Sequence, residues 1–296
     1  MNRKHKILKY IDPEGFGVEI GPSHNPIAPK RDGFKTHVID HMSRKQLLGK
    51  YKNHGVNLDN IEEVDFVWEG QPYAELLGSG KKYDWIIASH VIEHTPDLIG
   101  FLLDCDSILN DDGVISLAIP DKRYCFDRFR PITGLSDIVN SHAERRSIHS
   151  PGTVAEYYLN VVSKGGDIAW SPGQPGRFKF IHAPSEARSN MENAGANSAY
   201  ADLHAWCFVP SSFRLLIHDL HLLGLTPMRE VMFFPTSGCE FFATLGRRGS
   251  GPAESRLTLL RRVERESGFR ISGANSAGFL RGLAKQLFNS LRRPSH

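Results

Sequence analysis

The chain has 296 residues, of which 40% are hydrophobic and 23% charged, and its formal net charge is +3. This length and composition suffice for one full α/β core with room for an insertion and a tail. No stretch approaches the roughly 20 apolar residues that span a bilayer, and the basic first residues are not followed by an apolar signal segment. These features argue against a membrane-spanning protein and predict a cytoplasmic location.

The first predicted strand is the apolar run Gly17–Ile20, which carries Glu19 and ends in a tight turn at Gly21. A glycine at this point lets the chain turn sharply and lets a ligand touch backbone N–H groups. Nineteen positions later, a second apolar run ends in Asp40, whose carboxylate can accept hydrogen bonds from two ribose hydroxyls. The two runs predict the nucleotide-binding half of an α/β sheet.

The turn after the first strand lacks the glycines of a dinucleotide-binding turn. Residues 23–26 read Ser-His-Asn-Pro, where Gly-x-x-Gly would let a helix N-terminus hold a pyrophosphate. Glu19 would also repel phosphate and attract a positively charged amino group. Both features favour S-adenosylmethionine over a dinucleotide as the cofactor.

The following elements alternate between strand and helix. Strands are predicted over 66–70, 83–89 and 113–120, the last after a turn at 110–113, and helices over 44–52, 72–77 and 97–109. A helix over 211–223, N-capped by Ser211 and Ser212 and closed by Gly224, precedes two antiparallel strands over 228–234 and 239–245, joined through 235–238. The alternation predicts a doubly wound, mostly parallel sheet.

Together these elements resemble the class I S-adenosylmethionine-dependent methyltransferases, in particular a bacterial type 11-like methyltransferase domain. Glu19-Ile20-Gly21 is similar to the first motif of the family, although Ser23 and Asn25 replace its second and third glycines. The segment 83–94, ending in Glu93-His94, resembles the fourth strand and the turn near the sulfonium of the cofactor. The resemblance covers residues 15–120 and 206–246.

The resemblance implies an α/β fold with a seven-stranded, Rossmann-like sheet whose last strand is reversed. Asp40 matches the ribose-binding acid, Glu69 matches the acid near the adenine amino group, and His94 would shape the cofactor pocket. The implied cofactor-binding residues are Glu19, Gly21, Pro22, Ser23, Asp40, Glu69, Ser89, His90 and His94.

Residues 121–205 form a long insertion between the fifth strand and the last helix, rich in Ser, Gly, Pro, His and aromatic residues. A structureless loop of this length in a compact domain is usually functional, so we expect it to form the acceptor site and a lid. It leaves and re-enters the predicted sheet at the carboxyl edge, where open α/β sheets bind ligands.

Transfer to a hydroxyl needs a general base, for which histidine is well suited near neutral pH. The candidates are His142, His182 and His204, of which His204 is favoured because Asp202 and Trp206 are its neighbours. No compact cluster with metal-ligand spacing is evident, so no metal site is predicted. The four cysteines have no close pairing and are expected to be buried free thiols.

The last fifty residues form a separate electrostatic unit. Residues 247–296 contain eleven Arg or Lys and three Glu, so their formal net charge is +8, whereas that of the whole chain is +3. We therefore divide the chain into a methyltransferase domain over 1–246 and a linker with a basic amphipathic tail over 247–296. Docking of the tail on the chain's own surface, or fraying, is favoured over contact with an anionic membrane, and nucleic acid ranks last.

The sequence thus favours a methyltransferase that acts on a hydroxyl or amine of a polar small molecule such as a sugar or glycan intermediate. Two alternatives remain open at this point. One is a nucleoside-binding regulatory module without catalysis, and the other is a dinucleotide-dependent sugar-modifying enzyme.

Overall fold

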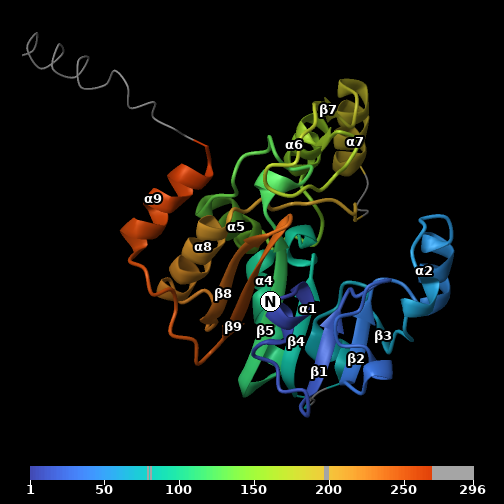
Figure 1. The fold of residues 1–296 in the computed structure, drawn as a ribbon, viewed down its shortest axis with the longest axis vertical. Helices are drawn as coiled ribbons and strands as arrows, with labels where there is room; N and C mark the ends of the chain where they lie inside the picture. Colours follow the sequence, from blue (N-terminus) through green and yellow to red (C-terminus); the bar gives the residue numbers. More distant parts are fainter. Residues whose placement is uncertain (79, 81, 197–199, 269–296) are drawn as a thin grey trace, which may run out of the picture.

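The computed structural model describes residues 1–78, 80, 82–196 and 200–268, and within them a central sheet has the strand order β3-β2-β1-β4-β5-β9-β8 (Figure 1). Strands β1 to β5 pair in parallel, whereas β9 runs antiparallel to both β5 and β8. The strands are Phe16–Ile20 (β1), Lys35–Asp40 (β2), Phe66–Val67 (β3), Tyr83–Ser89 (β4), Leu109–Pro120 (β5), Arg229–Ser237 (β8) and Glu240–Gly246 (β9). The predicted doubly wound sheet with a reversed last strand is confirmed.

The helices around the sheet are Arg3–Leu8 (α1), Arg44–Tyr51 (α2), Tyr73–Leu77 (α3), Leu98–Ile108 (α4), Pro210–Leu222 (α8) and Arg256–Glu266 (α9), with short 3-10 turns at Lys30–Asp32, Leu58–Asn60, Ile92–His94 and Lys122–Tyr124. Helices α2, α3, α4 and α8 lie where the sequence predicts helices, whereas α1 and α9 were not predicted. Helix α4 begins after Asp97, whose carboxylate accepts a hydrogen bond from the Gly100 N–H at 2.9 Å. Such caps satisfy N–H groups that have no partner within the helix.

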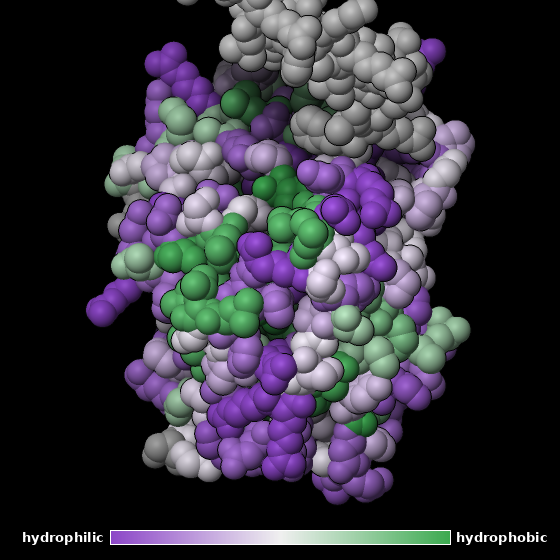
Figure 2. Space-filling view, turned by 90° about the vertical axis from the view of Figure 1, so that its left-hand side faces the viewer, coloured by the Kyte–Doolittle hydropathy of each residue, from purple (hydrophilic) through white to green (hydrophobic). Residues whose placement is uncertain are grey.

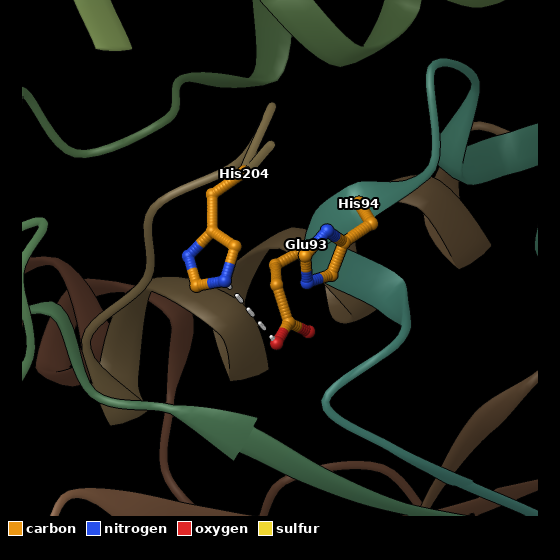
Figure 3. A group of neighbouring side chains, drawn as sticks. All are labelled: Glu93, His94 and His204. Atoms are coloured by element: carbon orange, nitrogen blue, oxygen red, sulfur yellow. Dashed lines mark ion pairs between the residues drawn. The ribbon is translucent and has the colours of Figure 1, made fainter. Parts of the chain in front are cut away.

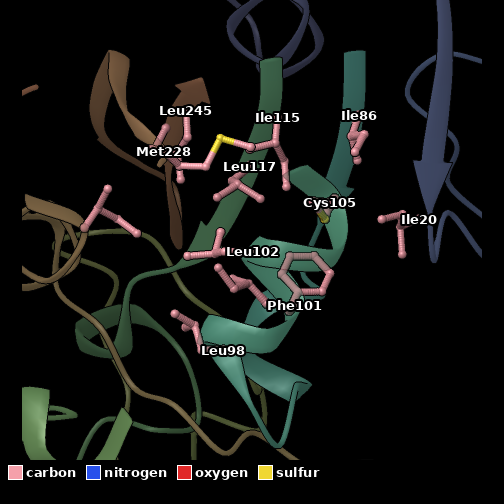
Figure 4. Packing of buried hydrophobic residues seen from close by; sticks show 14 of the residues in the cluster. Ile20, Ile86, Leu98, Phe101, Leu102, Cys105, Ile115, Leu117, Met228 and Leu245 are labelled. Carbon is pink, nitrogen blue, oxygen red and sulfur yellow. The ribbon is translucent and has the colours of Figure 1, made fainter. Parts of the chain in front are cut away.

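The core lies on both faces of the sheet. On one face, apolar residues of β1, β4 and β5 pack against α3, α4 and α8, and Figure 4 shows Leu98, Phe101 and Leu102 of α4 turned towards this layer. On the other face, Ile7 of α1 and the segment around Ile27 cover β4. The central strand β4 is therefore buried on both sides, as is typical of parallel sheets.

The insertion is folded, not structureless as expected from its composition. It contains α5 (Leu135–Ala143), α6 (Pro151–Asn160), α7 (Pro184–Ala196) and a small antiparallel sheet of β6 (Val162–Lys164) and β7 (Phe178–Phe180). Its helices α6 and α7 stand beyond the end of β5, over the carboxyl edge of the sheet (Figure 1). Local caps explain part of this order, since Ser150 accepts a hydrogen bond from the Thr153 N–H at the start of α6.

Three predicted boundaries are wrong. Residues 110–113, expected as a turn before β5, lie within that strand as an irregularity between the paired residues Leu109 and Val114. The hairpin between β8 and β9 turns at Gly238 and Cys239, because β8 continues to Ser237. Helix α8 begins at Pro210, so Ser211 and Ser212 lie in its first turn and not at its cap.

The described part of the chain after β9, up to residue 268, packs against the domain. Arg247 pairs with Asp106, and α9 lies against α8, where the Arg256 guanidinium donates to Asp219 at 2.8 and 2.9 Å. Exposed leucines of the two helices are Leu222, Leu257 and Leu260, and Leu223 directly after α8 is exposed as well. The face that carries these helices shows apolar residues among hydrophilic ones (Figure 2). The predicted amphipathic stripe over 279–293 lies outside the described residues.

Among the described residues, no helix is long and apolar enough to cross a membrane. Cys105, Cys125 and Cys207 are buried free thiols as expected, whereas Cys239 is half-buried.

Candidate active site

Three of the predicted cofactor residues, Gly21, Asp40 and Ser89, lie at the point where the sheet reverses its winding. From β1 the chain continues to β2 on one side, and β4 later adds to the other side. Gly21 directly follows β1, while Asp40 and Ser89 end β2 and β4. Ligands of open α/β sheets bind in the crevice at this switch point, outside the carboxyl ends of the strands.

The turn after β1 holds an unusual backbone conformation. Gly21 has a φ of 62°, and Ser23, two residues on, has a φ of 52° although it is not glycine. Left-handed backbone at a residue with a side chain is strained and persists where the surroundings impose it. Here the Ser23 N–H donates to the Asp40 carboxylate at 3.2 Å. The glycine-like shape of the turn is thus kept without the glycine.

Two of the three carboxylates expected to contact the cofactor, those of Glu19 and Asp40, are buried. Asp40 also accepts a hydrogen bond from the His41 N–H at 2.8 Å. The Glu19 carboxylate accepts from the N–H groups of Ile27 at 2.6 Å and Ala28 at 3.0 Å, and burial raises its pKa to about 7 against the opposing effect of these bonds. Glu19 therefore fixes the segment that follows the turn, and its contact with a cofactor amino group stays a prediction.

The turn after β4 is held by the N-terminal helix and the last strand. The Arg3 guanidinium donates to the Ser89 hydroxyl at 2.7 Å and to Glu240 at 2.7 Å, and His90 Nε2 lies 2.9 Å from the same Glu240. His90 has a φ of 55°, which is a second strained position at this edge. Of the other predicted contacts, Pro22 is half-buried and Glu69 is exposed beside β3.

Beyond this turn, Glu93, His94 and His204 form a compact cluster (Figure 3). Glu93 and His94 come from the 3-10 turn after β4, and His204 comes from the end of the insertion. His204 Nε2 lies 3.8 Å from a Glu93 carboxylate oxygen. The rings of His94 and His204 are in edge-to-face contact, with 4.6 Å between their centroids. Glu93 is fully buried, and neither of its carboxylate oxygens has a hydrogen-bond partner among the described residues.

A buried ion-paired chain orients His204. Its Nδ1 lies 2.5 Å from Asp127, whose carboxylate also accepts from the Arg130 guanidinium at 2.9 Å. Burial alone would raise the pKa of Asp127, but His204 and Arg130 bring it down to about 2. Since Nδ1 faces an ionised carboxylate, it carries the proton and Nε2 faces the cluster.

Two further groups border the cluster. Asp202 lies 3.0 Å from His94 Nδ1 and 3.7 Å from the Lys50 ammonium of α2, so it links the cofactor side of the sheet to the end of the insertion. His149 is buried without a hydrogen-bond partner for either ring nitrogen among the described residues.

The other two candidate bases lie elsewhere. His142 Nδ1 is 2.9 Å from Asp97, at the start of α4. Two aromatic rings lie between His182 and His204: Tyr157 contacts His182, Phe126 contacts His204, and the two contact each other. The structure therefore brings only His204 of the three into the Glu93–His94 cluster, within the part of the chain that it describes.

The roles of Glu93 and Asp127 in this arrangement do not follow from the sequence pattern. Asp127 stands 77 positions before His204, and its signal in the sequence is no stronger than that of any other acid in the insertion. Glu93 was noticed only as part of a motif. A buried acid beside a histidine at a strand end is the local feature that could have marked it.

A family model described as a methyltransferase domain matches residues 3–183, more than half of the chain. The chain belongs to this family and is a class I S-adenosylmethionine-dependent methyltransferase, which confirms the predicted family, enzyme class and cofactor. No curated protein matches it.

Solved structures similar to this chain include the CcbJ methyltransferase from Streptomyces caelestis, at 10% identity and a TM-score of 0.42 over 83% of this chain and 96% of that one. A DhpI complex described as DhpI-SAM-HEP shares 14% identity at a TM-score of 0.38, covering 80% of this chain and 81% of that chain. The trans-methyltransferase CalH, in complex with SAH, shares 12% identity at a TM-score of 0.40, covering 81% of this chain and 53% of that chain.

Proposed function

We propose that this methyltransferase transfers its methyl group to a hydroxyl of a polar small molecule, with a sugar or glycan intermediate as the preferred class. The observation that supports this most strongly is the buried Asp127–His204 pair. Its Nε2 faces the cluster at the carboxyl edge of the sheet, one turn beyond the predicted cofactor contacts. A proton acceptor held in this way is needed for a hydroxyl but not for a neutral amine, which already has a free electron pair.

The cofactor would lie across the switch point. In this proposal the Gly21–Ser23 turn gives backbone contacts, Asp40 accepts from the ribose hydroxyls, and Glu69 lies near the adenine amino group. Ser89 and His90 border the methionine end, which places the sulfonium next to Glu93. Glu19 acts by holding the segment after the turn in place.

Methyl transfer at this site is an in-line displacement. An electron pair of the acceptor oxygen attacks the methyl carbon, the carbon–sulfur bond breaks, and its electrons return to sulfur to give S-adenosylhomocysteine. The hydroxyl proton passes to His204 Nε2, and Asp127 stabilises the resulting imidazolium. The site then needs only to hold the two reactants in line and to exclude water.

The insertion over 121–205 would supply the acceptor site. The ring of Phe126 contacts those of His204 and Tyr157, and the ring of Tyr200 contacts that of His149 while its hydroxyl donates to the His94 carbonyl. We also propose that the methyltransferase domain proper covers 1–246, with α9 docked on its helix α8, and that the positive charge of 247–296 favours contact with an anionic surface where glycan intermediates are assembled. Unchanged vesicle binding after deletion of 275–296 would contradict that second proposal.

The test is methyl transfer from labelled S-adenosylmethionine to a panel of sugars and glycan intermediates. We expect His204→Gln to lower kcat by about 10²- to 10⁴-fold while cofactor affinity stays unchanged. Asp127→Asn, which acts through His204, should lower kcat with little change in KM. His182→Gln, one layer behind the cluster, should change kcat far less, and equal losses in the two histidine variants would contradict the assignment.

A further inference from the structure

The Glu93 carboxylate poses a physical problem that no described side chain solves. It is fully buried, and neither oxygen accepts a hydrogen bond from the described residues. The imidazole nitrogens that approach it are His90 Nδ1 at 3.6 Å and His204 Nε2 at 3.8 Å, both beyond hydrogen-bond distance. A buried carboxylate without a partner is costly, and a bound cation would remove the cost.

The neighbours of Glu93 carry ligand atoms for such a cation. One carboxylate oxygen of Glu93 and one ring nitrogen each of His94 and His204 lie within 4.8 Å of one another. Figure 3 shows the Glu93 carboxylate extending below the two imidazoles, which come from opposite sides. Two nitrogen ligands and one oxygen ligand from three side chains leave further coordination positions open.

The surroundings of His204 match those of a metal-bound histidine. A metal-ligating imidazole usually donates its second N–H to a carboxylate, which fixes its tautomer and orientation. His204 Nδ1 faces the Asp127 carboxylate in this way. Asp127 also accepts a hydrogen bond from the Arg130 guanidinium, which in addition donates to the His204 carbonyl at 2.8 Å. The opposite nitrogen, Nε2, is the one that faces Glu93.

We propose that Glu93, His94 and His204 form a binding site for a divalent transition-metal ion of the Zn²⁺ or Co²⁺ type. Two imidazoles and one carboxylate are a donor set that such ions prefer, and open positions are typical of metal sites that bind a substrate. Mg²⁺ and Ca²⁺ favour sites built from oxygen ligands, so they fit this set poorly.

The site also refines the proton step, and this part rests on the proposed function. An acceptor hydroxyl bound to the ion would lose its proton to solvent on coordination, because a divalent ion lowers the pKa of a bound hydroxyl. With the ion bound, His204 Nε2 would be a ligand of the ion and would not accept the hydroxyl proton. Binding of the ion itself does not depend on which acceptor is used.

The experiment titrates the chelator-treated, full-length protein with Co²⁺, followed by visible absorption, and with Zn²⁺, followed by calorimetry. We expect one saturable site and d–d bands of a low-symmetry Co²⁺ complex. Glu93→Gln, His94→Ala and Asp127→Asn should each lower the affinity at least 10-fold, the last because outer partners typically contribute about 10- to 100-fold. His221→Ala, a histidine of α8 whose ring faces the Thr226 carbonyl, is the matched control and should bind normally.

Absence of saturable binding would overturn the proposal, as would binding that survives both Glu93→Gln and His94→Ala. His94 is partly exposed, so its variant keeps the test decisive if the buried Glu93 variant does not fold, which circular dichroism reports. The proposed function fails separately. Saturable binding without methylation of any hydroxyl acceptor would refute the acceptor class alone, whereas His204-dependent, chelator-insensitive transfer without metal binding would refute the metal site alone.

Discussion

Glu19 should make the stability of this protein depend on pH in a defined window. Its carboxyl group is buried beside β1, and burial raises its pKa from 4.5 to about 7. In the unfolded chain the group ionises at its ordinary value. Between the two pKa values the native state holds a proton that the unfolded state has released, so the free energy of unfolding falls as the pH rises.

The size of the effect follows from the shift. A difference of one pKa unit corresponds to about 1.4 kcal/mol, so this shift gives about 3 kcal/mol in total. This stabilisation is fully present below pH 4.5 and is lost as the pH approaches about 7. Other groups also contribute to the pH dependence of stability. Glu19→Gln removes the contribution of Glu19 alone while keeping the shape of the side chain, so it serves as the reference.

The measurement is urea unfolding of the wild type and Glu19→Gln at several values from about pH 5 to about pH 8. We expect the stability of the wild type relative to the variant to decline by about 2 to 3 kcal/mol over this range. A difference that stays constant would refute the reasoning. It would mean that the N–H groups of Ile27 and Ala28 keep the carboxylate ionised throughout, against the effect of burial.

Three further changes test other parts of the structure. Asp40→Ala should weaken S-adenosylmethionine binding by about 10- to 100-fold in calorimetry, because hydrogen bonds to a charged group are lost; unchanged affinity would remove the ribose role. Gly17→Ala should destabilise the fold by at least about 1 to 3 kcal/mol, since its Cβ would lie 2.1 Å from the Trp85 ring. Added Trp85→Leu should recover part of this loss, and strictly additive costs would contradict the clash. Arg214→Ala should cost about 3 to 5 kcal/mol in urea unfolding because it leaves the buried Glu230 carboxylate unpaired, and a loss below about 1 kcal/mol would contradict this.

The sheet was predictable because its signals are local. Runs such as 83–89 and 113–120 are long and apolar, and helix α4 has an apolar stripe with an acidic cap. Helix α1 was missed because its six residues are mostly basic, and it is held by distant contacts such as the Ser116 hydroxyl donating to the Ile7 carbonyl at 2.6 Å. The helices of the insertion bury at most two residues each, so no apolar stripe marks them in the sequence.

The site was predictable only in its first half. Asp40 and Ser89 end strands and His94 follows one, and a sheet of known order brings strand ends together. The pairing of His204 with Asp127 joins two parts of the insertion, and no periodicity records such a contact. Ser23 shows the opposite case, because the sequence lacks the glycine while the backbone keeps the left-handed shape that glycine would adopt.

The insertion leaves and rejoins the sheet at nearly the same place. Asp121, just after β5, forms a parallel bridge with Phe208, and the Lys122 N–H donates to the Phe208 carbonyl at 2.9 Å. A segment whose two ends meet can be lengthened, shortened or exchanged without stretching the scaffold. If the insertion holds the acceptor site as we propose, exchanging it as one unit would change the acceptor while the strands that carry the predicted cofactor contacts stay in place.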